Sequence, residues 1–303
     1  MNEQVEAILG NLYKQVKNRD QTVNYHAEIQ IGGCAFEVLI NDMPVYKYAG
    51  NDGSGSIGLS APINNNILKS GPQTWEVRVF PPEVKGKRLT ALPEGVKIEL
   101  SVEALKFRTD GVDNVSEPVK LIETPKKDKD GKQIYADAGK PLMVYKGTFL
   151  AKVPYELKGW SESVDLSKED EKKLKTELVL EYEKYRNWIG HNESVKIAQS
   201  LLSSEKETAQ SLFYDKALND EYIKTFNESW GRAGITMYPL ENYKMVYSGN
   251  GKMVTLERID HLYDPALAGW YILKKDSAED RRLKTFYLNF HRPKTGAPLE
   301  VIR

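Results

Sequence analysis

His261 stands between two carboxylates, Asp260 and Asp264, in a segment that we expect to be a loop between strands. A carboxylate that orients an imidazole can make that imidazole a general base, so these three residues are the candidate catalytic group of this sequence. Most loop residues perform no chemistry, and no second motif supports this group. An enzyme that uses His261 is therefore the second alternative among the functional hypotheses below.

The remaining histidines do not predict a metal site, because His26, His191 and His291 form no H-x-H, H-x-x-x-H or H-E-x-x-H pair. His26 and His291 fall on the polar faces of their predicted strands, so we expect both at the surface. Cys34 is the single cysteine, which excludes an internal disulfide and a thiolate-rich zinc site. It lies on an apolar strand face, where burial disfavours the reactive thiolate. We expect neither a metal nor a cofactor.

Two short motifs match binding loops by letters alone. Residues 53–58 match G-x-G-x-x-G, but Pro62 and an asparagine cluster follow where the nucleotide-binding helix would run. Residues 128–131 begin like a calcium loop, but Lys132 interrupts the alternating oxygen ligands that such a loop needs. We expect an inter-strand loop at the first motif and a turn at the second.

Composition favours binding to another protein. The chain of 303 residues has 43 basic and 43 acidic residues, so no net charge attracts nucleic acid or an anionic membrane. It has 17 tyrosines and 5 tryptophans, residue types that are enriched both in interface cores and in strands. Four of them flank predicted loops, where their side chains need not be buried in the core. These predicted binding residues are Tyr46, Tyr48, Tyr263 and Trp270.

The first half of the chain has the pattern of an antiparallel β-sandwich. One short amphipathic helix is expected within the first 16 residues. Apolar and polar residues then alternate over 24–31 and 34–40 around a Gly-Gly turn, which predicts a hairpin. Further strands are expected at 44–48, 75–80, 96–107, 119–123 and 145–157. Half-buried strands without crossover helices favour this architecture over a parallel α/β sheet.

The second half changes to helical periodicity. Ser167 and Asp170 resemble a capping box, which predicts a helix from there to Gly190. Two further helices are expected at about 193–203 and 205–230, followed by strands at 243–247, 253–259, 270–274, 283–291 and 299–302. The predicted fold is therefore mainly β, with an α+β second half in which helices precede a four- or five-stranded antiparallel meander.

Two domains are expected, because the composition changes near Gly159. Residues 1–160 would hold the N-terminal helix and the sandwich, and residues 161–303 the α+β domain. The polar stretch 125–141 and the linker 159–167 are the expected sites of proteolysis. The sequence has no signal peptide pattern and no run of eighteen apolar residues, so we expect a soluble protein. It would be cytoplasmic, or periplasmic if a signal peptide has been removed.

Two stretches resemble known architectures. Residues 40–45, then 63–71 and 75–79, resemble a strand-and-turn pattern of accessory β-sandwich domains in bacterial proteins, which implies a scaffold without an active site. The order of helices and then meander in the second half is similar to that of cone-shaped α+β folds of the nuclear-transport-factor-2 type, which implies a cavity in that half.

These observations lead to three functional hypotheses. The first is a non-catalytic protein-binding chain of bacterial type, with an immunity-like or accessory role as its most concrete form. The alternative is a carbohydrate or small-molecule binding module with an aromatic-lined cleft. The second alternative is a cone-like α+β enzyme that uses His261. None of the three predicts nucleic acid as a partner or insertion into a membrane.

Overall fold

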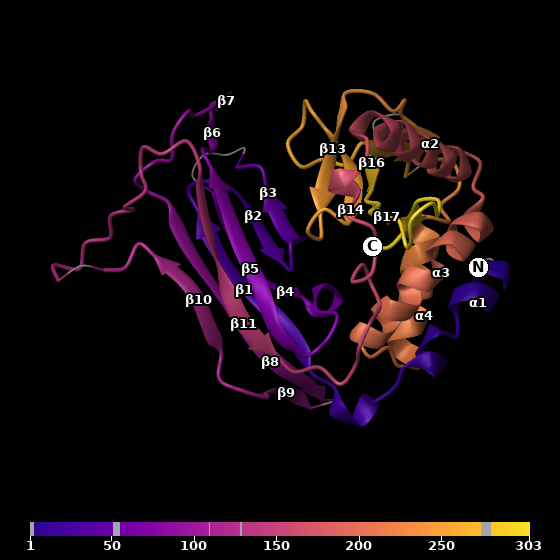
Figure 1. The fold of residues 1–303 in the computed structure, drawn as a ribbon, viewed down its shortest axis with the longest axis horizontal. Helices are drawn as coiled ribbons and strands as arrows, with labels where there is room; N and C mark the ends of the chain where they lie inside the picture. The colour runs from indigo at the N-terminus through magenta and orange to yellow at the C-terminus, as the bar shows by residue number, and fades with distance from the viewer. Residues whose placement is uncertain (1–2, 51–54, 109, 128, 274–279) are drawn as a thin grey trace. The chain divides into compact units, whose positions relative to one another are not determined.

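The computed structural model describes residues 3–50, 55–108, 110–127, 129–273 and 280–303 (Figure 1). The chain divides into two compact units. The β unit is Asp20–Glu156, and the α+β unit joins Met1–Arg19 to Leu157–Arg303.

The β unit is an antiparallel sandwich, as predicted. One sheet has the strand order β10-β8-β1-β4, with β9 paired to β8, and the other has the order β11-β5-β2-β3. The strands are β1 (Asn24–Gly32), β2 (Ala35–Ile40), β3 (Met43–Tyr48), β4 (Ser56–Pro62), β5 (Gly71–Phe80), β8 (Lys97–Arg108), β9 (Gly111–Asn114), β10 (Val119–Thr124) and β11 (Met143–Ala151). A small hairpin, β6 (Glu83–Val84) and β7 (Lys87–Arg88), lies apart from both sheets.

Alternation of apolar and polar residues explains why these segments are strands with one buried face. In β1 the apolar residues Tyr25, Ala27, Ile29 and Ile31 are buried, while the polar residues between them are more exposed. Cys34 is buried, as predicted, and the burial raises the pKa of its thiol to about 12.

The first glycine motif is not a loop throughout, which corrects our expectation. Gly53 and Ser54 lie outside the described residues, but Ser56 begins strand β4. Ile57, Leu59 and Ala61 alternate there with more exposed residues, a period-two signal that the glycines obscured. In the second motif Asp128 lies outside the described residues, and the turn predicted around it is present at 129–131.

The α+β unit contains the helices and the C-terminal strands. The helices are α1 (Glu3–Leu9), α2 (Glu171–Gly190), α3 (Ser194–Ser211) and α4 (Lys216–Ser229). One sheet has the order β12-β15-β16 and the other β13-β14-β17-β18. The strands are β12 (Thr236–Met237), β13 (Tyr243–Ser248), β14 (Met253–Arg258), β15 (Leu267–Ile272), β16 (Arg281–Phe286), β17 (Phe290–His291) and β18 (Glu300–Val301). No described helix is long and apolar enough to cross a membrane.

The helix boundaries differ in detail from those predicted. Asp170 is the N-cap of α2, and its carboxylate accepts a hydrogen bond from Lys173 N at 2.8 Å. Ser167 belongs instead to a 3₁₀ turn, Leu166–Lys168, that precedes the helix. Helix α3 continues past the predicted break at 204, and the interruption comes where Asp215 caps α4.

Helix α1 packs with the α+β unit, although we expected it beside the sandwich. Val5 and Leu9 belong to the same buried cluster as residues of α2, α3 and α4. Asn219 of α4 is fully buried and ties the N-terminal segment to that cluster, since its side chain donates to Leu9 O and accepts from Tyr13 N. The apolar face of a helix is stabilised by burial against any apolar surface. Helical periodicity therefore could not predict which of the two units this helix packs with.

The two segments expected to be open loops are partly anchored. Trp160 is buried, and Gly159 N donates a hydrogen bond to the Glu207 carboxylate at 2.9 Å. Within 125–141, the Tyr135 side chain is buried and its hydroxyl lies 2.9 Å from the Tyr145 hydroxyl. Most of the other described residues of this stretch are exposed, as predicted, apart from the buried Pro125 and the half-buried Asp137 and Ala138.

Candidate functional site

His261 lies in the exposed connection between β14 and β15. Both carboxylate oxygens of Asp260 accept from Arg258, at 2.9 and 2.6 Å, and this pairing lowers the pKa of Asp260. Within the described part of the chain, no group forms a hydrogen bond with the His261 ring. The structure places the three candidate residues close in sequence but does not bring a carboxylate into contact with the imidazole.

Three of the four predicted binding residues contribute to packing. Tyr46 and Tyr48 lie on β3, and each ring packs against the buried Phe36, with ring centroids 6.0 and 5.6 Å apart. Tyr263 is only 9% exposed and adopts a left-handed backbone conformation, φ 68°. These three side chains therefore offer a partner less surface than their positions beside predicted loops suggested.

Trp270 lies on a more exposed surface. In the hairpin of β15 and β16, Trp270 is directly opposite Leu283, and Ile272 is directly opposite Arg281. Opposite residues share a face of an antiparallel pair, so these four side chains form one surface, called here the hairpin surface. Leu283 is 63% exposed and Ile272 is 43% exposed. The Arg281 guanidinium lies over the Trp270 ring, 4.1 Å from its centroid.

The hairpin extends beyond the core of its unit. Leu267, at the start of β15, and Phe286, its partner at the end of β16, are both buried. Exposure then rises toward Ile272 and Arg281 at the other end of the pair. Apolar side chains at that distal end therefore remain accessible instead of joining the core.

Several positively charged side chains accompany the hairpin. A cationic cluster lies on or beside it, consisting of Arg232, Arg281, Arg282 and Lys284. The Arg232 guanidinium lies 4.3 Å from the centroid of the Tyr271 ring, and Lys284 Nζ donates to Ser229 Oγ at 2.9 Å. Burial, and then the nearby Arg232, lower the pKa of Lys284.

None of these four cations has an ion-pair partner among the residues that the structure describes. Arginines elsewhere do have such partners, such as Arg78 with Glu37 and Arg258 with Asp260. Four cations without an ion-pair partner in the described part of the chain therefore lie on or beside the hairpin, and the acidic residues Asp280 and Glu228 also lie near them.

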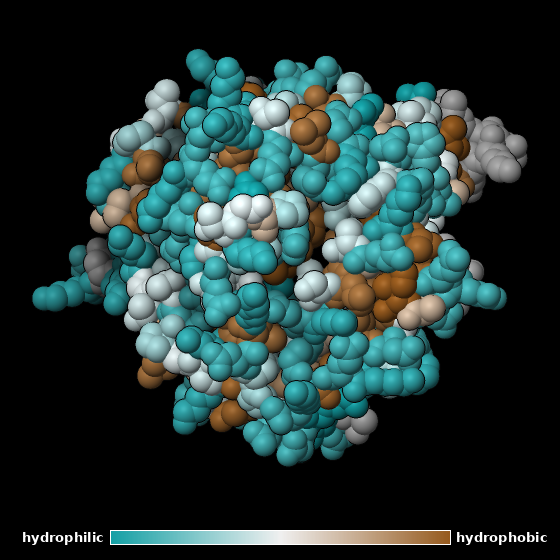
Figure 2. Space-filling view, turned by 45° about the vertical axis from the view of Figure 1, so that its right-hand side comes forward, coloured by the Kyte–Doolittle hydropathy of each residue, from teal (hydrophilic) through white to brown (hydrophobic). Residues whose placement is uncertain are grey.

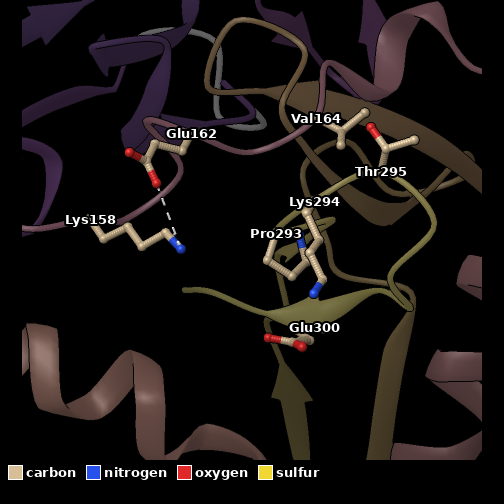
Figure 3. Close-up of a pocket in the computed structure, with 7 residues that line it drawn as sticks. All are labelled: Lys158, Glu162, Val164, Pro293, Lys294, Thr295 and Glu300. Carbon is tan, nitrogen blue, oxygen red and sulfur yellow. Dashed lines mark ion pairs between the residues drawn. The ribbon is translucent and has the colours of Figure 1, made fainter.

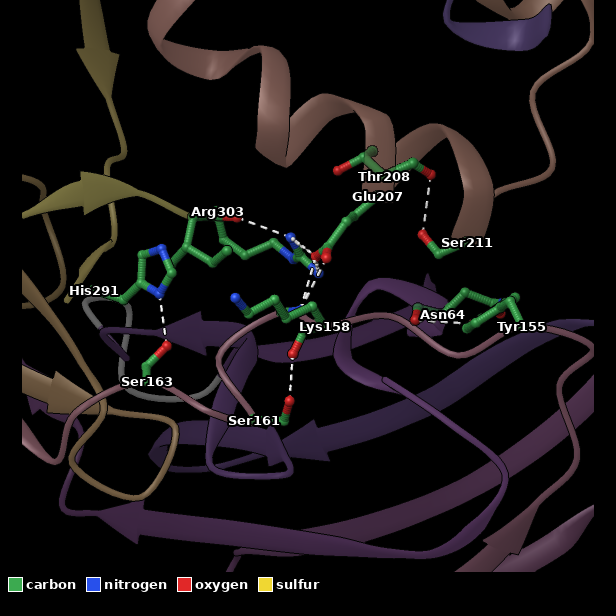
Figure 4. A network of polar contacts seen from close by, with 12 residues as sticks. Asn64, Tyr155, Lys158, Ser161, Ser163, Glu207, Thr208, Ser211, His291 and Arg303 are labelled. Carbon is green, nitrogen blue, oxygen red and sulfur yellow. Dashed lines mark hydrogen bonds and ion pairs between the residues drawn. The ribbon is translucent and has the colours of Figure 1, made fainter. Parts of the chain in front are cut away.

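A buried polar network occupies another part of the α+β unit (Figure 4). Ser163 Oγ and His291 Nδ1 are 2.6 Å apart, and both residues are buried. The Arg303 guanidinium contacts the Glu207 carboxylate at 3.3 Å. Burial lowers the pKa of His291 to about 4, so the ring is neutral at pH 7.

The Ser163–His291 pair does not form a catalytic triad. A nucleophilic serine needs access to substrate, and its histidine needs an orienting group. Ser163 is only 7% exposed, and no described carboxylate forms a hydrogen bond with His291. The pair instead ties the segment after Trp160 to strand β17. We had expected His291 at the surface, but β17 is an inner strand of its sheet, and both of its residues, Phe290 and His291, are buried.

An open cleft of about 760 Å³ lies beside this network. Its lining residues are Lys158, Glu162, Val164, Pro293, Lys294, Thr295 and Glu300. In Figure 3, Lys158 and Glu162 lie on one side of it, while Lys294 and Glu300 lie on the other. Lys158 Nζ is 3.8 Å from the Glu162 carboxylate. Two ammonium groups and two carboxylates make this a polar cleft without aromatic side chains.

The face shown in Figure 2 is mainly hydrophilic, and its hydrophobic residues gather in limited areas. In the part of the chain that the structure describes, no group of three or more histidine, cysteine, aspartate or glutamate residues is arranged to hold a metal ion.

Comparisons with protein-family models, curated proteins and solved structures found no match.

Proposed function

We propose that this chain is a non-catalytic protein-binding protein, and that the hairpin surface contacts an acidic region of its partner. The observation that carries the proposal is the half-buried Trp270 together with the exposed Ile272 and Leu283, beside a guanidinium. Tryptophan and arginine are the residue types most enriched among those that dominate binding energy at interfaces.

The cationic cluster gives the expected charge of the partner. Arg281 lies on the hairpin surface and has no carboxylate partner among the described residues, so an acidic group would find an unpaired cation there. Arg282, directly opposite Tyr271, and Arg232, over the Tyr271 ring, lie at the other face of the hairpin. Complementary charge accelerates association and orients the partner, while the apolar side chains beside Arg281 supply most of the affinity.

Site-specific crosslinking tests the location of the contact. A photoreactive amino acid replaces Leu283 in one variant and Leu180 in another, since both positions are highly exposed, at 63% and 66%. Leu180 lies on helix α2, away from the cationic cluster in sequence. In cells of the source organism, we expect a discrete protein adduct from position 283 and none from position 180.

A defined acidic probe tests the charge argument without a known partner. Polyglutamate should bind the full chain in low salt, and raising the salt concentration should weaken binding because the contacts are exposed charges. Arg281→Glu should weaken this binding at least tenfold, whereas Lys172→Glu, an equal charge change on α2, should alter it less than threefold. Equal effects of the two substitutions, or equal adducts from positions 283 and 180, would contradict the proposal.

A second candidate function is the binding of a small charged molecule in the cleft between Lys158 and Lys294. The volume of the cleft lies within the range of small-molecule sites, and its mixed charges suit a polar or zwitterionic ligand. A thermal-shift screen of amino acids and sugar acids tests it. A ligand that stabilises the natural chain but not the Lys158→Ala variant would support this function, and no hit in the screen would count against it.

A further inference from the structure

Strand β4 lies at one edge of its sheet and pairs only with β1 among the described strands. The pairing runs from Ser56 opposite Gly32 to Pro62 opposite His26, without a shift in register. An edge strand of this length presents a row of unpaired backbone groups on its other side.

The flanking hydrogen bonds show which backbone groups point outward. Gly33 N donates to Gly55 O at 3.2 Å, and Ile63 N donates to Tyr25 O at 2.9 Å. In an antiparallel pair, every second residue makes the hydrogen bonds to the partner strand, so this alternation continues through β4. The residues bonded to β1 are Ile57, Leu59 and Ala61. The N–H and C=O groups that face away belong to Ser56, Gly58 and Ser60.

Three of the other edge strands have features that discourage further pairing. Strand β16 carries three cations, β3 contains Pro44 and a register irregularity, and β10 carries charged residues and a shift near Lys120. Charges, prolines and bulges of this kind are the usual protection of exposed edges. Between Ser56 and Ser60, β4 has none of them.

The segment Ser-Ile-Gly-Leu-Ser is also self-complementary about its central residue, Gly58. If two copies are antiparallel around Gly58, Ser56 of one lies opposite Ser60 of the other, and Ile57 lies opposite Leu59. We propose that β4 is a homodimerisation strand, which pairs with β4 of a second copy and joins the two sheets into one.

The geometry of this pairing satisfies the outward-facing backbone groups. The three pairs would be Gly58 with Gly58 and, twice, Ser56 with Ser60. Each such pair exchanges two hydrogen bonds, so all N–H and C=O groups of these three residues would be used. Pro62, which has no N–H, limits the pairing to this short segment.

The side chains are compatible with the same register. Ile57 and Leu59 fall on the partly buried face, where they would extend the apolar row begun by Ile29 and Ile31 of β1. On the exposed face, Gly58 leaves space for the Gln30 amide, which lies where a Cβ would otherwise be. The Ser60 hydroxyl contacts the Glu28 carboxylate, and the residue opposite Ser60 would be a serine of the other copy, so this pair brings no like charges together.

Sedimentation equilibrium of the full chain tests the association. A contact of five residues per copy is small, so we expect a weak dimer that is half formed somewhere between about 5 and 500 μM. The mass should rise with concentration from that of one 34.4 kDa chain toward twice that value. A mass of one chain throughout this range overturns the proposal.

Disulfide trapping tests the register. Ser56→Cys and Ser60→Cys chains should crosslink when mixed, because opposite residues of a hydrogen-bonded pair have Cα atoms about 5.5 Å apart, within disulfide reach. Either variant alone should crosslink at least tenfold more slowly. The natural Cys34 is buried and should not contribute. Crosslinking in the mixture no faster than in the separate variants overturns the register.

Charge at the centre provides the matched comparison. Gly58→Lys places like charges directly opposite each other and should raise the dissociation constant at least tenfold. Gly58→Ala changes the same position without charge, and Thr148→Lys adds the same charge on β11, an edge of the other sheet. Both controls should change the dissociation constant less than threefold. A Gly58→Lys chain that dimerises like the natural one, with an unchanged circular dichroism spectrum, overturns the proposal.

Discussion

Tyr182→Phe should destabilise the α+β unit more than a single lost hydrogen bond would suggest. The Tyr182 ring is fully buried, and its hydroxyl joins helix α2 to the C-terminal strands. It accepts from Leu256 N at 3.0 Å, donates to Leu288 O at 3.0 Å and lies 2.9 Å from Thr255 Oγ1. Burial raises the pKa of this hydroxyl to about 12, so it stays protonated at pH 7.

The magnitude follows from the groups that the substitution leaves behind. Phenylalanine fills the same volume as the tyrosine ring, so the change creates no large cavity. The Leu256 N–H and the Leu288 carbonyl would each lose this partner in a buried site. A buried polar group without a partner costs about 1–3 kcal/mol, so the two groups left by Tyr182→Phe should together lower the free energy of unfolding by about 2–6 kcal/mol.

Tyr185→Phe, on the same helix, is the matched control. The Tyr185 hydroxyl donates only to Ser200 Oγ, at 2.7 Å, and Ser200 keeps its bond to the Ile197 carbonyl after the change. Its loss should cost about 0.5–1.5 kcal/mol.

Urea unfolding followed by tryptophan fluorescence measures both variants. Four of the 5 tryptophans, at 160, 188, 230 and 270, belong to the α+β unit, so the signal reports mainly on that unit even if the two units unfold separately. Equal losses for the two variants, or a loss below about 0.5 kcal/mol for Tyr182→Phe, would refute the reasoning from unpaired backbone groups.

Three further predictions concern other parts of the chain. Burial in the folded protein lowers the pKa of His291 from its ordinary value of 6.5 to about 4, so folding favours the neutral ring. The stability that depends on this neutral ring is therefore lost as the pH falls from about 6.5 to 4. His291→Gln should therefore lose less stability between pH 7 and pH 5 than the natural chain, and an identical loss in urea melts would contradict this. Cys34 is 1% exposed in the native state, so it should react with a thiol reagent at least a hundredfold faster in denaturant. Similar reaction rates in the two conditions would place Cys34 at the surface. A nonspecific protease should first cut between 126 and 134, where residues 126–127 and 129–134 are exposed, and spare 159–167, where Trp160 is buried. Early fragments that show the reverse by mass spectrometry would contradict the packing of that segment.

The proposed binding surface was only partly predictable from sequence. Trp270 was found because aromatic side chains beside loops are often available to partners, and the structure does leave it on an accessible surface. Tyr263 met the same criterion yet is buried, since a position beside a loop does not determine which way a side chain faces. Arg281 and Leu283 were not found, because their proximity to Trp270 depends on the register of β15 and β16.

Patterns of local sequence determined much of this fold. The alternation in β1 predicted a half-buried strand, and the apolar spacing of α2 predicted a helix whose buried face includes Leu174, Leu178 and Tyr182. Such patterns are informative because side-chain direction repeats every two residues in a strand and every 3.6 residues in a helix. Residues close in sequence therefore show which face of the element is buried. The same alternation is present in β4, where glycines and serines made it resemble a loop.

Only the tertiary structure decided which of these elements meet. Ser163 and His291 are separated by 128 positions, and Arg292 reaches Glu169 and Glu177 across a similar distance in sequence. Helix α1 joined the core of the α+β unit from the opposite end of the chain. Hydrophobic burial is not directional, and hydrogen bonds act only at short range. Neither interaction therefore indicates, from the sequence alone, which distant residues will be in contact in the folded chain.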